Sequence, residues 1–126
     1  MKRLYIGVCV LLILFLLGLL ISFATNQMYA PISRLLEEAA QAALSEDMAV
    51  ATQKAKEAKQ LWDKCKSATA TVADHTPMEE IDHMFSEADI YAQSGEKPHF
   101  AACCAQLAVM VQDMADAHRM NLWNLL

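Results

Sequence analysis

The stretch LYIGVCVLLILFLLGLLISF, from Leu4 to Phe23, decides the architecture of this chain. It runs for twenty residues without a charged side chain and directly follows Lys2 and Arg3. A helix of this length rises about 30 Å, the thickness of the hydrocarbon core of a bilayer, and satisfies its own backbone hydrogen bonds there. The stretch therefore predicts a transmembrane helix, with residues 1–24 acting as a signal-anchor.

Basic residues on the short side of the stretch set the expected orientation, because cytoplasmic flanks of membrane helices are rich in Lys and Arg. We expect a single-pass protein of the cytoplasmic membrane, with that end in the cytoplasm and the remaining residues extracytoplasmic. A cleaved signal, cut after Ala24, is the alternative, although signal apolar regions are usually only about 7–15 residues long. The pair Gly18 and Ser22, four residues apart, leaves open a homo-oligomer formed through the anchor.

The composition of the remaining chain narrows its fold and its partners. The whole chain has ten basic and fifteen acidic residues, and two of the basic ones precede the apolar stretch. An acidic exported part argues against nucleic acid as a partner. Gly and Pro are few, helix-forming residues dominate, and no segment alternates apolar and polar residues as a strand would. The sequence therefore predicts an all-α protein.

Beyond a juxtamembrane connection at residues 25–30, the extracytoplasmic domain is expected to cover residues 31–126 and to hold four helices. Pro31 and Pro98 suit first helical positions, and Thr76-Pro77 reads as a cap followed by a first helical residue. The predicted helices span residues 31–44, 48 to about 66, 77–94 and 98 onward. The first of them can continue almost unbroken from the anchor.

Two short connections predict how these helices pair. Residues 45–48 (SEDM) and 94–97 (SGEK) each join two helices, with Ser45 or Asp47 as a cap and Gly95 as a helix-ending residue. The domain is therefore expected to consist of two antiparallel helical hairpins. The apolar stripe of the second helix, at spacings of three and four, predicts that Trp62 is buried.

Several short motifs resemble one known family. They are the Lys-Arg start before a single anchor, LLEEA at 35–39, SED at 45–47, LWDK at 61–64, EEIDHM at 79–84 and NLL at 124–126. This layout resembles the domain-of-unknown-function family 4363 of Firmicutes and related bacteria over nearly the full length. The resemblance implies a small, single-pass, extracytoplasmic helical protein with no assigned activity, cofactor or catalytic residue.

Candidate chemistry is sparse. His99 and Cys103 share a helix face and are weak candidates for a metal, since imidazole and thiolate bind soft metals. We expect Cys65, Cys103 and Cys104 to be buried reduced thiols; a disulfide of Cys65 with Cys103 or Cys104, or within the vicinal pair Cys103–Cys104, is the alternative in an exported domain. Local spacing arranges no nucleophile with a base, so we expect neither an enzyme nor a bound cofactor.

The end of the sequence carries four large apolar residues that a frayed terminus would not need, namely Leu122, Trp123, Leu125 and Leu126. Three destinations are open for them: a groove of the helical domain, the membrane interface, or a partner protein with Trp123 as the main contact.

Taken together, these patterns favour an interaction or accessory module for another membrane or envelope protein. The alternatives are a small-ligand or metal sensor that uses the helical core, and a structural subunit that oligomerises through the anchor.

Overall fold

The computed structural model describes residues 1–69 and 75–124, without the side chains of residues 25, 69, 75, 118 and 121–124. Within these ranges the chain forms four α-helices and no strand, which confirms the all-α prediction. The helices are α1 (Lys2–Leu44), α2 (Met48–Thr69), α3 (His75–Ser94) and α4 (Lys97–Asn124).

The apolar stretch and the first domain helix form one continuous helix, α1. Residues 25–30, predicted as a connection, are themselves helical. Pro31 does not begin a helix as predicted but lies inside α1. Proline has no N–H, so α1 gives up the hydrogen bond from residue 31 to the carbonyl of Gln27. Burial of the neighbouring Tyr29 and Ile32 in the core offsets this loss.

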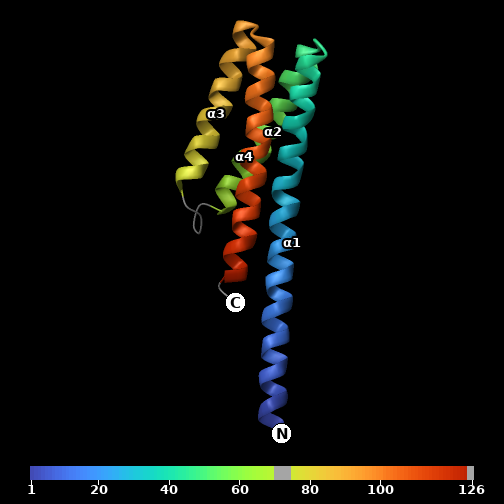
Figure 1. The fold of residues 1–126 in the computed structure, drawn as a ribbon, viewed down its shortest axis with the longest axis vertical. Helices are drawn as coiled ribbons and strands as arrows, with labels where there is room; N and C mark the ends of the chain where they lie inside the picture. Colours follow the sequence, from blue (N-terminus) through green and yellow to red (C-terminus); the bar gives the residue numbers. More distant parts are fainter. Residues whose placement is uncertain (70–74, 125–126) are drawn as a thin grey trace.

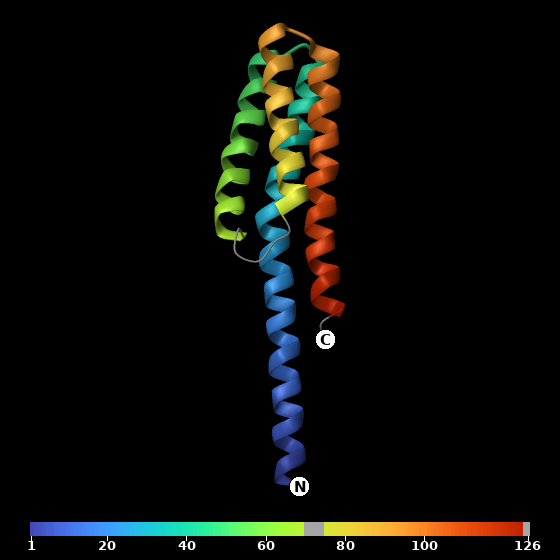
Figure 2. The same cartoon turned by 90° about the vertical axis from the view of Figure 1, so that its left-hand side faces the viewer.

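Figure 1 shows α1 rising from the bottom of the view to the top, α2 returning downward, α3 rising again and α4 descending beside α1. Figure 2 shows that the lower part of α1 extends alone beyond the other three helices. Along its upper part α1 packs against both α4 and α2, and α3 packs against α4. The helices α2 and α3 contact each other only lightly.

The apolar stripes of the four helices line one continuous core, and the predicted burial of Trp62 is confirmed. Trp62, Leu36, Phe100 and Leu107 are each no more than 1% exposed. Sequence patterns did not single out Tyr29 or five of the small buried residues of α1 and α4, namely Ser33, Ala40, Ala101, Ala108 and Ala115. The part of α1 and the three other helices that enclose this core are called the helical domain below.

The two short connections end their helices in the same way. After α1, the N–H of Asp47 bonds the carbonyl of Ala42 at 2.9 Å while Glu46 adopts a positive φ of 63°. After α3, the N–H of Glu96 bonds the carbonyl of Tyr91 at 3.1 Å, and Gly95 supplies the positive φ. Both connections are Schellman-type ends, which confirms Gly95 as a helix-ending residue.

Asp47 is the cap of α2. Its carboxylate accepts the N–H of Val50 at 3.3 Å and its carbonyl accepts the N–H of Ala51 at 3.0 Å. One residue thus closes α1 and opens α2, and this resolves the choice between Ser45 and Asp47.

The apolar stretch of α1 contrasts with this buried core. By length and composition α1 is apolar enough to cross a membrane, and none of the apolar window is buried in the structure. Between residues 1 and 24 every residue is exposed except Gly18 and Ser22, which are partly covered. Among the described residues, the rest of the chain therefore leaves most of the apolar surface of this stretch uncovered, in contrast to the core.

Candidate functional site: the groove between α2 and α3

A polar cluster joins the lower ends of α2 and α3. The indole N–H of Trp62 donates a 2.8 Å hydrogen bond to Oδ1 of Asp82, and Nζ of Lys66 pairs with Oδ2 of the same carboxylate. Lys59 Nζ lies 3.9 Å from Asp82 Oδ1 and 2.6 Å from Asp63. Asp82 is therefore the acceptor on which α2 and α3 converge, and it completes the burial of a polar indole.

Two opposing effects act on the pKa of Asp82. Burial raises it, but hydrogen bonds from Lys66 and Trp62 and the charge of Lys59 outweigh burial, so the pKa lies below its usual value. The hydrogen bond with Asp82 raises the pKa of Lys66 in turn. The cluster is thus an ionised, fully paired structural link at neutral pH.

Above this cluster a groove of about 240 Å³ opens between α2 and α3. Its apolar lining consists of the rings of Phe85 and Phe100 and the methyl groups of Ala55, Ala88 and Ala92. Its polar lining is Thr52, Lys56, Lys59, Ser86 and Asp89. The groove exists because small alanines face each other where two helices contact only lightly.

The two cationic residues of the groove differ in their partners. Lys59 pairs with Asp63 and also lies 5.7 Å from the centre of the Phe85 ring. Lys56 makes no ion pair with any residue that the structure describes. Across the groove, Asp89 accepts a hydrogen bond from Gln93 at 2.9 Å. The α2 side of the groove therefore offers one free positive charge next to an apolar floor.

The structure places the two predicted metal candidates in different environments. His99 is exposed, stacks on Tyr91 with ring centres 5.3 Å apart, and has Nδ1 3.8 Å from a Glu96 oxygen. Cys103 is buried, and its thiol donates to the carbonyl of Met84 at 3.3 Å. Within the described ranges no three His, Cys, Asp or Glu side chains gather as a metal site would require.

The cysteines of the helical domain are buried in the core as thiols, and no disulfide joins them. Cys65 donates to the carbonyl of Met28 at 3.6 Å, so it lies against α1. Burial, with a smaller effect of Glu87, raises the pKa of Cys103 to about 11. Burial and the neighbouring Cys103 raise the pKa of Cys104 to about 12. Thiols held protonated in this way are poor nucleophiles and poor metal ligands near neutral pH.

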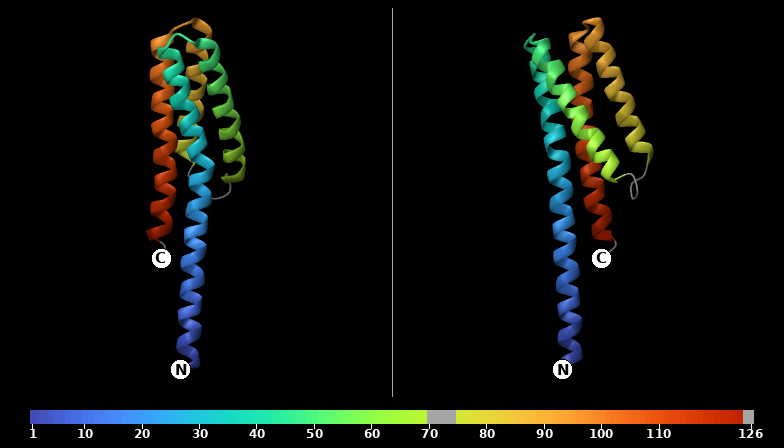
Figure 3. Two further views of the ribbon diagram at one scale, coloured as in Figure 1. Left: turned by 90° about the vertical axis from the view of Figure 1, so that its right-hand side faces the viewer. Right: turned by 180° about the vertical axis from the view of Figure 1, so that it is seen from behind.

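The predicted interaction residues at the end of the sequence are only partly described. Leu122 and Trp123 belong to α4, which stays helical through Asn124, but their side chains lie outside the description. Leu125 and Leu126 lie outside the described residues altogether. The backbone of α4 runs on downward to Asn124 without turning back (Figure 3).

The sequence patterns predicted neither the groove nor the polar cluster below it. Asp82 is twenty residues from Trp62, and no local spacing connects them. The alanines of the groove lie on the core-facing stripes of α2 and α3, and a stripe does not tell whether the neighbouring helix approaches closely. One usable signal existed for Tyr29, because it precedes Ile32 and Leu36 at helical spacing and extends the same stripe backward.

Comparison with known proteins gives one match. The family model described as a domain of unknown function, DUF4363, matches residues 20–125. Searches of curated proteins and of solved structures find no match. The matched residues include the whole helical domain and the last residues of the apolar stretch.

Proposed function

The chain belongs to the DUF4363 family, and from its geometry we propose that it is a membrane-tethered module that binds another membrane or envelope protein. The observation that carries this proposal is the contrast along α1. Its first half is apolar and bare, while from Tyr29 onward one face of the same helix is buried in the core. An uninterrupted helix of this kind fixes the domain at a set height and angle above the bilayer.

The orientation follows from charge. Lys2 and Arg3 favour the cytoplasmic side for the lower end of α1, which puts the acidic helical domain outside the cytoplasm. The proposed domain consists of two hairpins, α1 with α2 and α3 with α4, supported by the tight Schellman-type connections after Leu44 and Ser94. Removal of the first 24 residues would leave every buried core residue in place, so the same domain suits a cleaved or an uncleaved product.

The groove between α2 and α3 is the proposed docking surface. Its occupant is an amphipathic helix of the partner that presents a large apolar side chain to Phe85 and Phe100 and an acidic side chain to Lys56. A volume of about 240 Å³ accommodates one or two such side chains and lies below the roughly 300–1,000 Å³ of typical small-molecule sites. This difference favours a protein over a small ligand.

Thiol labelling tests the orientation. Ala68 is exposed at the lower end of α2, and the native cysteines of the domain are buried and protonated, so they react slowly. We expect a membrane-impermeant maleimide to label an Ala68→Cys variant in intact cells. Labelling that occurs only after lysis would place the domain in the cytoplasm and reverse the proposal.

Crosslinking tests the docking surface. A photoreactive amino acid at Thr52 lies in the groove, whereas the same group at the adjacent exposed Gln53 provides the control. We expect one recurring membrane protein to crosslink at residue 52 and not at 53. Lys56→Glu should abolish that product, and Lys64→Glu, also exposed on α2, should not. Equal crosslinking at both positions, or indifference to Lys56→Glu, would exclude the groove.

A further inference from the structure

The depth of α4 relative to the apolar stretch can be read from one buried contact. The Ser33 hydroxyl donates to the carbonyl of Ala108 at 3.1 Å, so these two residues lie at the same height on α1 and α4. The two helices run in opposite directions (Figure 1), and each residue further along α4 is therefore level with one residue earlier on α1. At the upper end the same register pairs Lys97 with Leu44, the observed ends of the two helices.

Extended toward the beginning of α1, the same register places the last turns of α4 level with the apolar stretch. Met120 is level with Ile21, and Asn124 is level with Leu17. Since the apolar stretch ends at Phe23, the last turns of α4 extend about 9 Å past that boundary, at 1.5 Å per residue. Figure 1 shows the same relation, with the end of α4 beside the apolar part of α1.

The other two helices stop before that depth. Cys65 is level with Met28 through its thiol hydrogen bond, so the end of α2 at Thr69 reaches only about the level of Ala24. The contact of Cys103 with Met84 places the beginning of α3 higher still. The described part of α4 therefore extends past the level of Phe23, whereas α2 and α3 end above that level.

Partial burial on α1 shows which face α4 covers. Gly18 and Ser22 are the two residues between 1 and 24 that are not exposed. Ser22 precedes Ser33 by eleven residues, about three helical turns, and so lies on the face that contacts α4. The small residues that could have paired two anchors are thus partly covered within a single chain.

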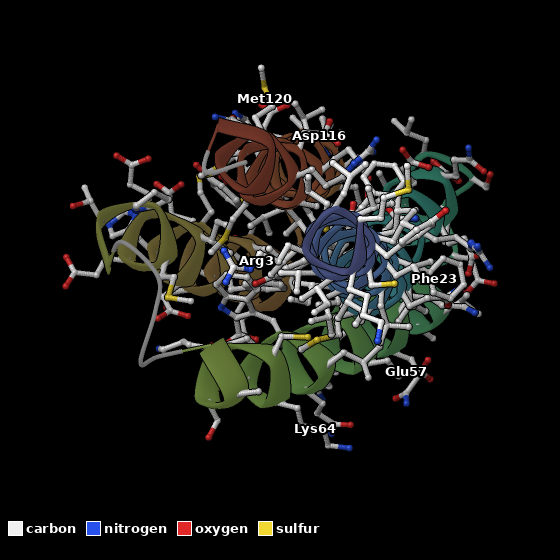
Figure 4. All side chains as sticks on the ribbon, turned by 90° about the horizontal axis from the view of Figure 1, so that it is seen from below. Arg3, Phe23, Glu57, Lys64, Asp116 and Met120 are labelled. Carbon is white, nitrogen blue, oxygen red and sulfur yellow. The ribbon has the colours of Figure 1, made fainter. Side chains whose placement is uncertain are left out.

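The residues of α4 at this depth suit a lipid environment. Met120 is 68% exposed, and Figure 4 shows its side chain pointing away from α1. Leu122 and Trp123 follow in the sequence. Arg119 is charged, but its guanidinium lies 3.6 Å from Asp116, one turn back toward the aqueous side, as a snorkelling side chain would.

We infer that the last turns of α4, residues 118–124, enter the outer leaflet of the membrane and pack against the Gly18–Ser22 face of the anchor. The occupant of this surface is lipid at the boundary between headgroups and acyl chains, where Trp and amphipathic helix ends bind. The chain then stands on the bilayer with two helices, one that crosses it and one that enters it. This inference rests on the proposed membrane anchoring of α1.

Fluorescence quenching in vesicles tests the inference on the full chain. The chain has two tryptophans, and the difference between wild type and Trp123→Phe isolates the emission of Trp123 without disturbing the buried Trp62. In phosphatidylcholine vesicles with a spin label near the headgroups, we expect Trp123 to be quenched at least about twofold more than Trp62. Equal, weak lipid quenching of both, with strong quenching of Trp123 by aqueous acrylamide, would overturn the inference.

Flotation of the same vesicles separates the two proposals. Protein that floats with the vesicles but lacks lipid quenching of Trp123 retains the anchor and loses only the inference about α4. Protein that does not float loses the proposed anchoring and the inference together.

A disulfide test probes the packing on the anchor. Ser22 lies eleven residues before Ser33 on α1, and Arg119 lies eleven residues after Ala108 on α4, so Ser22 and Arg119 are level with each other. We expect the double variant Ser22→Cys, Arg119→Cys to form an intrachain disulfide on mild oxidation, and Ser22→Cys with Met120→Cys to form it much less. Covalent dimers from Ser22→Cys alone, in place of the intrachain product, would show that the face pairs with a second copy and would overturn the packing.

Discussion

Two contacts between helices, here called the seam between α1 and α4 and the seam between α2 and α3, differ in the residues that form them. Along α1 and α4, small residues face each other: Ser33 meets Ala108, and seven residues away Ala40 is level with Ala101, all of them buried. Between α2 and α3 one ionised cluster holds the lower end, and an open groove lies above it. The first seam buries its small residues and is the more closely packed of the two. The second is polar and loosely packed.

The largest expected loss of stability comes from replacing Trp62, because its side chain contacts both α1 and α3. Trp62 on α2 is buried, and its ring centre lies 6.4 Å from the ring centre of Tyr29 on α1. Its indole N–H donates a hydrogen bond to Asp82 of α3. Trp62→Ala should cost about 3–5 kcal/mol of unfolding free energy, because it removes a buried aromatic side chain. Urea unfolding of the full chain in detergent micelles measures the loss. A cost below about 1 kcal/mol would mean that Trp62 is at the surface and not buried as described.

Overpacking tests whether the seam between α1 and α4 is as close as its small residues indicate. Ala108→Leu should cost toward the upper end of roughly 1–3 kcal/mol, since the added carbons have no room beside Ser33. Val109→Leu is the matched control, because Val109 is exposed on the same helix and should tolerate the change. If both variants unfold at the same urea concentration, the seam is looser than described.

The polar cluster of the other seam should respond to pH. Asp82→Ala removes the acceptor of the Trp62 N–H and should cost roughly 1 kcal/mol at pH 7, the low end for a partly exposed group. Asp82→Asn keeps an acceptor and should cost less.

The pH dependence has a defined sign. The pKa of Asp82 is lowered in the folded state, so its ionised form stabilises the fold above the unfolded value of about 3.8, and this contribution is lost as pH falls through the folded value. The stability difference between wild type and Asp82→Asn should therefore shrink below about pH 4. A difference that grows on acidification would contradict the assigned shift.

The smallest expected change in stability concerns the short connections after α1 and α3. Glu46 and Gly95 hold the same left-handed conformation at equivalent helix ends, and the first is a non-glycine residue. Glu46→Gly should stabilise the chain by about 0.5 kcal/mol, the relief of strain less the entropy cost of glycine. Gly95→Ala should have the opposite sign and about the same or larger size. Thermal unfolding of both variants checks the pair, and a destabilising Glu46→Gly would contradict the strain.

The sequence predicts which residues of a helix are buried, but not how two helices are aligned with each other. The stripe at helical spacing on the second helix identified Trp62 as a buried core residue, because burial of one helix face is a local property. The register between α1 and α4 was out of reach, since it depends on a contact between Ser33 and Ala108, seventy-five residues apart. Pro31 was misplaced because its local preference for a first helical position yields to packing on both sides of it.

By itself, the sequence determined the helical class, the bare apolar stretch from Leu4 to Phe23, the end of α3 at Gly95 and the family. These features depend on composition, spacing and the conformational freedom of single residues, all of which act within a few residues of the chain. Only the tertiary structure decided that Asp82 serves Trp62, that alanines leave a groove between α2 and α3, and that α4 reaches the depth of the apolar stretch. The physical reason is that each depends on the distance and register between helices, which the summed packing of the whole core sets.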